Sequence, residues 1–501
     1  MPWDPQPDAA AGCKSDSRDW QNATCCYNGK RDLCEERGIF RNRNRRRRCS
    51  RRDVIAGAAA TAVLASLPRT ARAFSNSRPN IVFILADDLG YADLSCYGRR
   101  EYRTPRLDGI AADGLLMSQA YSSSAVCSPT RVALITGRYP GRLRAGLEEP
   151  IARPNEQVGL PPTHPTLPAL LRSHGYRTAL VGKWHMGWPP HFGPLRSGYD
   201  RFYGIIPGAA DYFTHGGMDG AAPAGSGLME GDDYIRRGGY LTELLADRAC
   251  AELRDAAAAA QPLFLSLHFT APHWPWQGPG DADVDFELRD LFHRDGGTLE
   301  KYAEMVTAMD SAVGRVLDEI RTLGLEDDTI LVFTSDNGGE RFSDNWPLRG
   351  EKADLLEGGI RVPQLVRWPG RIAAGSRSTQ VMASMDWLPT LAAAAGVSPD
   401  PAAPPDGEDL LPVLTGAGPA RDRTIFWRFK NRGQAAVRSG NWKYLRQRDQ
   451  ESLFDLAGDP RERANLKDRH PDIFTSLRQQ YESWNSQMLP YPEGSVSAGP
   501  G

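Results

Sequence analysis

Cysteine is scarce in most of this 501-residue sequence. Five of the eight cysteines lie within the first 49 residues, and only Cys96, Cys127 and Cys250 follow. Disulfide bonds therefore do not hold the main part of the fold together. Cys96 and Cys250 either pair with each other or lie buried as small apolar side chains, and the sequence allows both.

Basic residues are in the minority once the first 73 residues are set apart. Those residues hold 15 Lys and Arg against 8 Asp and Glu, which leaves 45 basic and 54 acidic residues beyond them. Such an acidic body argues against a general surface for nucleic acid or for anionic membranes. A local basic pocket for one anionic group remains compatible with it. Hydrophobic residues make up 41% of the chain, enough for a sizeable core.

The apolar run that follows the arginine-rich stretch is too short for a membrane span. Val54–Leu67 offers 14 mildly apolar residues, whereas a spanning helix needs about 20. The sequence Ser50-Arg51-Arg52-Asp53-Val54-Ile55 resembles a twin-arginine export motif, and Ala71-Arg72-Ala73 offers a cleavage site. We expect a signal peptide cut after Ala73, the twin-arginine export machinery as a partner, and a periplasmic or secreted protein. A basic tail followed by an Ala-rich surface helix is the alternative.

The first 49 residues carry the remaining cysteines, Cys13, Cys25, Cys26, Cys34 and Cys49. A small metal or disulfide module would use them, but no repeated C-x-x-C spacing supports zinc. We interpret residues 1–73 as an N-terminal extension that includes the signal peptide, and we assign no function to the cysteines.

Four apolar runs, each followed by polar residues, predict buried strands. They are Asn80–Ala86 before Asp87-Asp88, Thr178–Val181 before Gly182-Lys183-Trp184-His185, Leu263–Phe269 before Ala271-Pro272-His273, and Ile330–Phe333 before Ser335-Asp336-Asn337-Gly338-Gly339. A helical spacing of apolar residues runs from Tyr302 to Ile320. Alternating strands and helices predict an α/β fold, with a mainly parallel sheet flanked by helices. The polar residues would then meet at the carboxyl ends of the strands, where such sheets bind ligands.

Beyond Ser398 the residue pattern changes from alternating strands and helices to a loop followed by short strands. Residues 398–409 read as a loop, and strand-like runs follow at Thr424–Phe429, Ala435–Arg438 and Trp442–Leu445. We therefore expect a main domain over 74–415, a smaller C-terminal α+β subdomain over 416–490 and a flexible tail over 491–501.

Cys127-Ser128-Pro129-Thr130-Arg131 is the most informative stretch of the chain. Asp-Asp, C-x-P-x-R, G-K-W-H, P-H, D-N-G and a lysine before Glu357-Gly358-Gly359 follow one another in this order. Each motif alone could be a turn or a cap, but the ordered set resembles the sulfatase family. The resemblance covers Pro79 to about Leu466 and is nearest to arylsulfatase A and N-acetylgalactosamine-6-sulfatase. It implies an alkaline-phosphatase-like fold.

The resemblance also implies that Cys127 is a precursor. In the family, a formylglycine-generating enzyme oxidises this cysteine to formylglycine, an aldehyde whose hydrate attacks sulfate esters. Thr130 stands where serine is commonest and keeps the hydroxyl. The same match makes Asp87, Asp88, Asp336 and Asn337 ligands of one calcium ion, with an oxygen of the modified Cys127 near the metal. Hard oxygen donors from two strand ends suit such an ion.

The remaining roles are carried over in the same way. Arg131 would contact the hydrate and offset negative charge, and His185 would contact the hydrate and help break down the sulfated intermediate. Lys183 and Lys352 would bind sulfate, and His273 would stand near the leaving-group oxygen. Which of His185, His273 and Lys352 acts as general acid stays open.

The expected reaction is hydrolysis of a sulfate monoester of an aryl or carbohydrate alcohol. One alternative is a phosphonate monoester or phosphodiester hydrolase that uses the same site. Another is a non-catalytic calcium-binding protein in which Cys127 stays a thiol. Trp274 and Trp276 would either stack on a substrate ring or pack beneath a loop, and His215 lies in a segment where the family places substrate-contacting loops.

Overall fold

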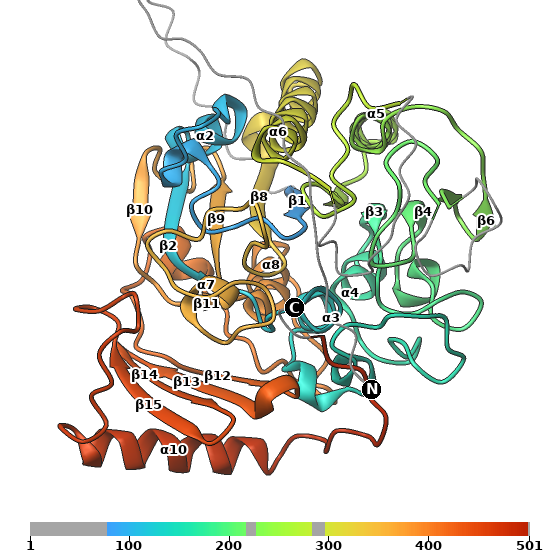
Figure 1. Cartoon of the computed structure of the whole chain (residues 1–501). Helices are drawn as coiled ribbons and strands as arrows, with labels where there is room; N and C mark the ends of the chain where they lie inside the picture. Colours follow the sequence, from blue (N-terminus) through green and yellow to red (C-terminus); the bar gives the residue numbers. More distant parts are fainter. Residues whose placement is uncertain (1–77, 217–226, 283–295, 499–501) are drawn as a thin grey trace, which may run out of the picture. The chain divides into compact units, whose positions relative to one another are not determined.

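One sheet of 11 strands organises the larger part of the protein (Figure 1). The computed structural model describes residues 78–216, 227–282 and 296–498, so the expected extension and signal peptide lie outside the described residues. The strands follow the order β10 (Ser376–Ser378), β2 (Leu115–Tyr121), β9 (Arg361–Arg367), β8 (Thr329–Ser335), β1 (Asn80–Ala86), β7 (Leu263–His268), β3 (Arg177–Lys183), β4 (Arg201–Ile205), β5 (Met229–Glu230) and β6 (Asp233–Tyr234), and β11 (Met382–Ala383) also pairs with β2.

The centre of this sheet is parallel. β8, β1, β7, β3 and β4 run in one direction, while β9 is antiparallel to both β8 and β2. The predicted mainly parallel sheet is therefore confirmed. In the β1–β8 pair, Ala86 lies opposite Ser335. The residues that follow the two strands, Asp87 and Asp336, thus emerge side by side.

Helices cover both faces of the sheet, and its central strands are therefore buried on both sides. Alternate residues of β1 enter different cores: Val82 and Ile84 pack with residues of α2 (Pro105–Ala112), α5 (Leu241–Ala258) and α6 (Leu299–Thr322). Ile81 and Phe83 pack with α3 (Cys127–Thr136), α4 (Leu167–Ser173) and α8 (Trp387–Ala394). This layering confirms the predicted α/β fold and leaves the carboxyl ends of the strands open for a site.

A second, antiparallel sheet forms the smaller C-terminal part. It consists of β12 (Thr424–Phe429), β13 (Gln434–Ser439), β14 (Trp442–Gln447) and β15 (Gln450–Asp455), and α10 (Pro471–Asn485) packs against it. Short helices α7 (Glu357–Ile360) and α9 (Leu411–Leu414) precede it. The three expected strands are confirmed. Its core also includes Ala133 of α3, so this sheet packs behind the helix that carries Cys127.

Two smaller features concern the last described residues and the cysteines. Within 491–498, where the sequence predicts a flexible tail, Ser497 forms a β-bridge with Glu149 and Tyr491 hydrogen-bonds the same residue. Cys96 and Cys250 are free thiols, so they do not pair. Within the described ranges, no helix combines the length and apolar character that crossing a membrane requires.

Candidate active site

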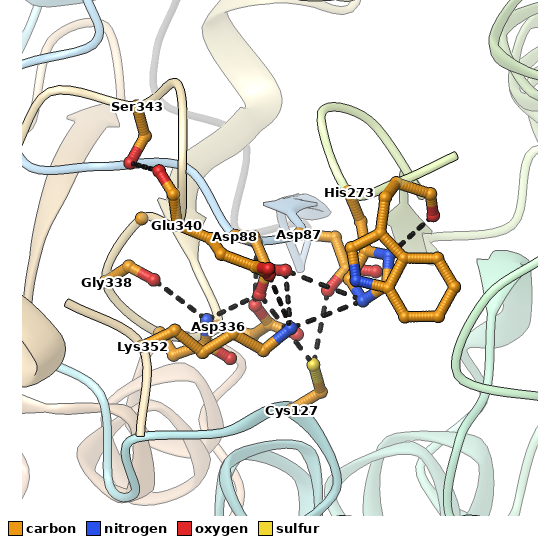
Figure 2. Close-up of polar contacts among 12 residues, drawn as sticks. Asp87, Asp88, Cys127, His273, Asp336, Gly338, Glu340, Ser343 and Lys352 are labelled. Atoms are coloured by element: carbon orange, nitrogen blue, oxygen red, sulfur yellow. Dashed lines mark hydrogen bonds and ion pairs between the residues drawn. The ribbon is translucent and has the colours of Figure 1, made fainter. Parts of the chain in front are cut away.

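Cys127 is the first residue of α3 and points at the carboxylates that follow β1 (Figure 2). Its Sγ lies 3.4 Å from Asp87 Oδ1 and 4.0 Å from Asp88 Oδ1. Burial, followed by the negative charge of Asp336, raises the pKa of the Cys127 thiol well above its usual range. Because the thiolate is the nucleophilic form of cysteine, the encoded residue is poorly suited to nucleophilic attack in its present surroundings.

Carboxylate and amide oxygens from β1 and β8 converge beside Cys127. The Asp88 amide lies 3.3 Å from Asp336 Oδ1, and Asn337 Nδ2 donates to Asp88 Oδ1 at 2.6 Å. The buried Oδ1 of Asn337 has no hydrogen-bond partner among the described residues. Single donor atoms of Asp87, Asp88, Cys127 and His273 all lie within 4.8 Å of one another. Such a group can hold a cation.

The electrostatics of these carboxylates favour a cation as well. Burial, and next the neighbouring Asp336, raise the pKa of Asp87 to about 7, although Lys183 and Arg131 act in the opposite direction. Buried carboxylates this close repel one another, and a positive ion bound between them would relieve that repulsion.

Arg131 lies one helical turn after Cys127 and is fully buried. Its Nε and Nη2 donate to Asp336 Oδ2 at 3.0 and 2.8 Å, and Nη1 donates to the carbonyl of Lys183 at 3.1 Å. The guanidinium therefore offsets the negative charge of Asp336 and joins the ends of β3 and β8. The acceptors of all three hydrogen bonds are atoms of the protein.

Two lysines contact the pair of carboxylates that follows β1, one lysine for each carboxylate. Lys183 Nζ lies 2.5 Å from Asp87 Oδ2, and Lys352 Nζ lies 2.6 Å from Asp88 Oδ2. Lys352 also contacts Glu340 Oε2 at 3.4 Å. Burial lowers the pKa of Lys352, but Asp88 and Glu340 outweigh it and raise that pKa well above its usual range. The Lys352 ammonium is thus held in its charged form.

His185 is held in one tautomer by the backbone. Its Nε2 donates to the carbonyl of Ile151 at 2.9 Å, and its buried Nδ1 has no partner in the part of the chain that the structure describes. Burial, and next the charge of Lys183, lower the pKa of His185 well below its usual range. A neutral ring that donates from Nε2 presents the lone pair of Nδ1, so His185 offers a hydrogen-bond acceptor at that nitrogen. Its φ of 58° is unusual for a residue other than glycine.

His273 lies beside the carboxylate cluster, and Lys352 links it to Asp88 (Figure 2). Its Nδ1 donates to the carbonyl of Trp274 at 2.7 Å, while Nε2 lies 3.3 Å from Lys352 Nζ and 3.5 Å from Asp88 Oδ2. The half-buried ring of Trp274 lies against the imidazole, with centroids 4.4 Å apart. His273 therefore presents Nε2 to the carboxylates, beside an aromatic face.

The comparison with protein families identifies the chain. The family model described as Sulfatase matches residues 79–397, and the one described as N-sulphoglucosamine sulphohydrolase, C-terminal, matches residues 351–487. This protein belongs to the sulfatase family. It is therefore a sulfuric ester hydrolase, as the sequence predicted.

Named sulfatases are similar along most of their length. Human arylsulfatase A is 34% identical over 456 residues, which cover 80% of this chain and 86% of that protein. Mouse arylsulfatase J is 30% identical over 482 residues, covering 85% and 79%. Human N-acetylgalactosamine-6-sulfatase is 34% identical over 366 residues, covering 70% and 68%. The predicted resemblance to the arylsulfatase A and N-acetylgalactosamine-6-sulfatase types is confirmed.

Solved structures of similar proteins share the architecture of this chain. The crystal structure of Ps i-CgsB superposes with a TM-score of 0.76 at 29% identity, covering 84% of this chain and 96% of that one. The phosphonate monoester hydrolase of Agrobacterium radiobacter, at 23% identity and a TM-score of 0.60, shares the fold. The alkaline-phosphatase-like architecture is thus confirmed for this sulfatase.

Nine of the ten residues predicted for the site of this sulfatase are joined by the contacts described above, whereas His185 hydrogen-bonds the Ile151 carbonyl. Sequence reasoning missed Glu340, which contacts Lys352 and lies three residues after Asn337 in a segment already singled out. It also missed His268, a fully buried residue at the end of β7 whose ring nitrogens have no hydrogen-bond partner among the described residues. An inward-facing histidine in an apolar strand would have been the only signal for it.

Two other residues take structural places. His215 Nε2 contacts the carbonyl of Gly239 at 3.0 Å, and burial lowers the pKa of His215. Trp276 is buried and packs edge-on against Phe342 with centroids 4.9 Å apart. Of the two tryptophans considered for substrate contact, Trp274 is the one that lies beside the site.

Proposed function

We propose that this sulfatase hydrolyses sulfate monoesters of aryl or carbohydrate alcohols through a formylglycine made from Cys127 and one bound calcium ion. One observation carries the proposal: Cys127 Sγ lies 3.4 Å from Asp87 at a point where four oxygen-donor side chains and two lysines converge. The cluster contains donors for a metal ion and cations for a sulfuryl group in one place.

The side chains fit calcium. Asp87, Asp88, Asp336 and Asn337 would hold the ion, and the buried Asn337 Oδ1, which lacks a partner among the described residues, is an oxygen of the right kind. When bound, calcium supplies positive charge that neutralises the sulfuryl oxygens and orients the ester. Arg131 holds Asp336 in place for this purpose through two hydrogen bonds to Oδ2.

A formylglycine hydrate at this position would supply one hydroxyl to attack sulfur as the S–O bond to the departing alcohol breaks, and a second whose deprotonation would reform the aldehyde as the C–O bond to sulfate breaks. His185 presents Nδ1 as the acceptor for a proton from the hydrate. Lys183 and Lys352 would bind the sulfate oxygens. His273, with Lys352 beside its Nε2, serves the leaving-group oxygen.

Two observations bear on the alcohol part of the ester. The ring of Trp274 beside His273 suits a flat aryl group or the apolar face of a sugar. Ps i-CgsB, similar over most of the chain, was crystallised in complex with k-i-k-neocarrahexaose. Both facts favour a ring-bearing alcohol over an aliphatic one.

We also propose that the protein is exported. The twin-arginine pathway carries folded proteins, and Cys127 is 2% exposed in the fold, so the formylglycine-generating enzyme would act in the cytoplasm on a chain not yet folded. Thiol-form precursor in the cytoplasm alongside converted exported protein would contradict this order.

The decisive experiment is mass spectrometry of the tryptic peptide ending at Arg131, from protein made in a host that has the converting enzyme. Loss of sulfur with gain of oxygen at Cys127 supports the proposal. Quantitative alkylation by iodoacetamide instead supports a non-catalytic protein.

A second experiment tests the substrate class. Converted enzyme is given p-nitrophenyl sulfate and a phenylphosphonate ester in competition. A much higher kcat/KM for the phosphonate would favour the phosphonate monoester hydrolase alternative. Chelation should abolish turnover, and added calcium should restore it.

A further inference from the structure

The last described stretch of the chain lies along a loop next to the active site. The Glu149 amide donates to the carbonyl of Val496 at 3.0 Å, and the Ala498 amide donates to the carbonyl of Glu149 at 2.5 Å. Ser497 and Glu149 form a parallel β-bridge. We call residues 489–498 the C-terminal segment. This segment pairs with the Glu149 loop in the manner of a strand, through that one bridge.

The side chain of Glu149 ties this segment down further. Its Oε1 accepts from the Tyr491 hydroxyl at 2.5 Å, and its Oε2 accepts from the Ser497 hydroxyl at 2.7 Å and from the Lys430 amide at 2.8 Å. Glu149 is only 2% exposed. A buried carboxylate with three donors is expensive to leave unpaired, so segment and loop are held as one unit.

Two residues further on, the same loop reaches the catalytic cluster. The Ile151 amide donates to Ser128 Oγ at 3.0 Å, and the Ile151 carbonyl accepts from His185 Nε2 at 2.9 Å. Ser128 directly follows Cys127 in α3. Ile151 therefore connects the helix of the nucleophile with His185, and it decides which nitrogen of His185 carries the proton.

Other contacts anchor the C-terminal segment at both ends. The Leu489 amide donates to the carbonyl of Gly141 at 2.8 Å. Lys430 Nζ contacts the carbonyl and hydroxyl of Ser495 at 2.6 and 2.8 Å. The segment has no helix or strand of its own beyond the single bridge, so its order depends on these contacts with the main body.

We propose that the C-terminal segment is a positioning element of the active site: by holding Glu149, it fixes the Ile151 carbonyl and with it the tautomer and orientation of His185. The catalytic consequence rests on the proposed function, in which His185 accepts a proton from the hydrate. The structural consequence, an ordered Ile151 and His185, does not depend on which reaction the protein catalyses.

The test compares wild type with Tyr491→Phe and with a chain ended after Pro490. Tyr444→Phe is the matched control, because it removes a similar hydrogen bond, from Tyr444 to Glu451 Oε1 at 2.7 Å, within the small sheet. Hydrogen–deuterium exchange is followed in the peptides that contain Ile151 and His185. We expect faster exchange there in both test variants and unchanged exchange in the control.

Turnover is measured on the same samples after the formylglycine content of each has been matched by mass spectrometry. We expect kcat to fall on the order of tenfold in the shortened chain, with KM changed by less than about threefold, because misplacing a proton acceptor slows chemistry more than binding. Glu149→Gln, which keeps one acceptor oxygen, should retain more activity than Glu149→Ala.

Exchange at Ile151 and His185 that stays at the wild-type rate in both test variants overturns the positioning role, whatever the activity. Faster exchange with unaltered kcat overturns its catalytic consequence. If wild-type enzyme with formylglycine hydrolyses no sulfate ester, the proposed function fails, and the exchange data alone decide the positioning role. Tyr491→Phe keeps the test informative if the shortened chain does not fold.

Discussion

Arg131 donates two hydrogen bonds to the same oxygen of Asp336, at 3.0 and 2.8 Å, and both side chains are completely buried. The pair crosses from α3 to the end of β8 and is 205 positions apart in the sequence. Because the carboxylate is buried beside Asp87 and Asp88, Arg131 compensates its negative charge. Arg131 thus acts on the proposed metal site by stabilising one of its ligands.

Replacing Arg131 by Met should lower the free energy of unfolding by about 3 kcal/mol or more, because it leaves buried carboxylate charge uncompensated. Urea denaturation measures the change. Arg254→Met is the control, since Arg254 pairs with Glu319 at 2.8 Å with half of its side chain exposed, and such pairs contribute less than about 1 kcal/mol. Equal losses in the two variants would show that Arg131 is not needed to hold the carboxylates.

Gly208 leaves room for the imidazole of His185. A Cβ at this position would lie 2.6 Å from His185 Cε1 and 2.7 Å from Nε2. Gly208→Ala should therefore displace the ring and reduce kcat on the order of tenfold or more. Gly238→Ala, where a Cβ meets nothing within 4 Å, provides the control. Steady-state kinetics at matched formylglycine content measure kcat of both variants. An unchanged kcat in Gly208→Ala would argue against His185 as the proton acceptor.

Trp274 should bind the alcohol part of the ester. An aromatic contact of this kind contributes about 0.5–1.5 kcal/mol. Trp274→Ala should thus raise KM for p-nitrophenyl sulfate by roughly three- to tenfold, and Trp274→Phe should restore most of the affinity. A loss confined to kcat would indicate instead that Trp274 only supports His273, against which it packs.

Glu149 should make stability depend on pH. Burial raises the pKa of Glu149 from 4.5 to about 7 in the folded protein. Between these values the folded chain keeps a proton that the unfolded chain has lost, so stability from this group is greatest below about pH 4.5 and falls as the pH rises to about 7. Urea denaturation at a series of pH values should therefore show that the free energy of unfolding of Glu149→Gln declines less steeply with rising pH than that of wild type. The difference should amount to at most about 3 kcal/mol, and parallel curves would contradict it.

Much of this architecture follows from local patterns. The run Asn80–Ala86 is β1 to the residue, and the apolar spacing from Tyr302 to Ile320 lies within α6. Both are long segments in which side-chain burial and local propensity agree. The polar residues after each strand could be placed together because parallel strands end at one edge of a sheet.

Other parts of the site have no local signature. Ile151 acts through its amide and carbonyl, so its side chain reveals nothing, and Gly208 matters only because His185 lies against it. The bonds between Glu149 and Tyr491 join positions 342 residues apart. Contacts of this kind depend on how loops cross in space, which no periodicity encodes.

The sequence by itself determined the family, the order of strands and polar clusters, and the cysteine motif, because these depend on which residues stand next to one another. Only the tertiary structure decided that Arg131 is bound to Asp336, that Glu340 lies beside Lys352, and that the chain end holds the loop that orients His185. The physical reason is that hydrogen bonds and burial depend on distances of a few ångströms between segments, which folding alone establishes.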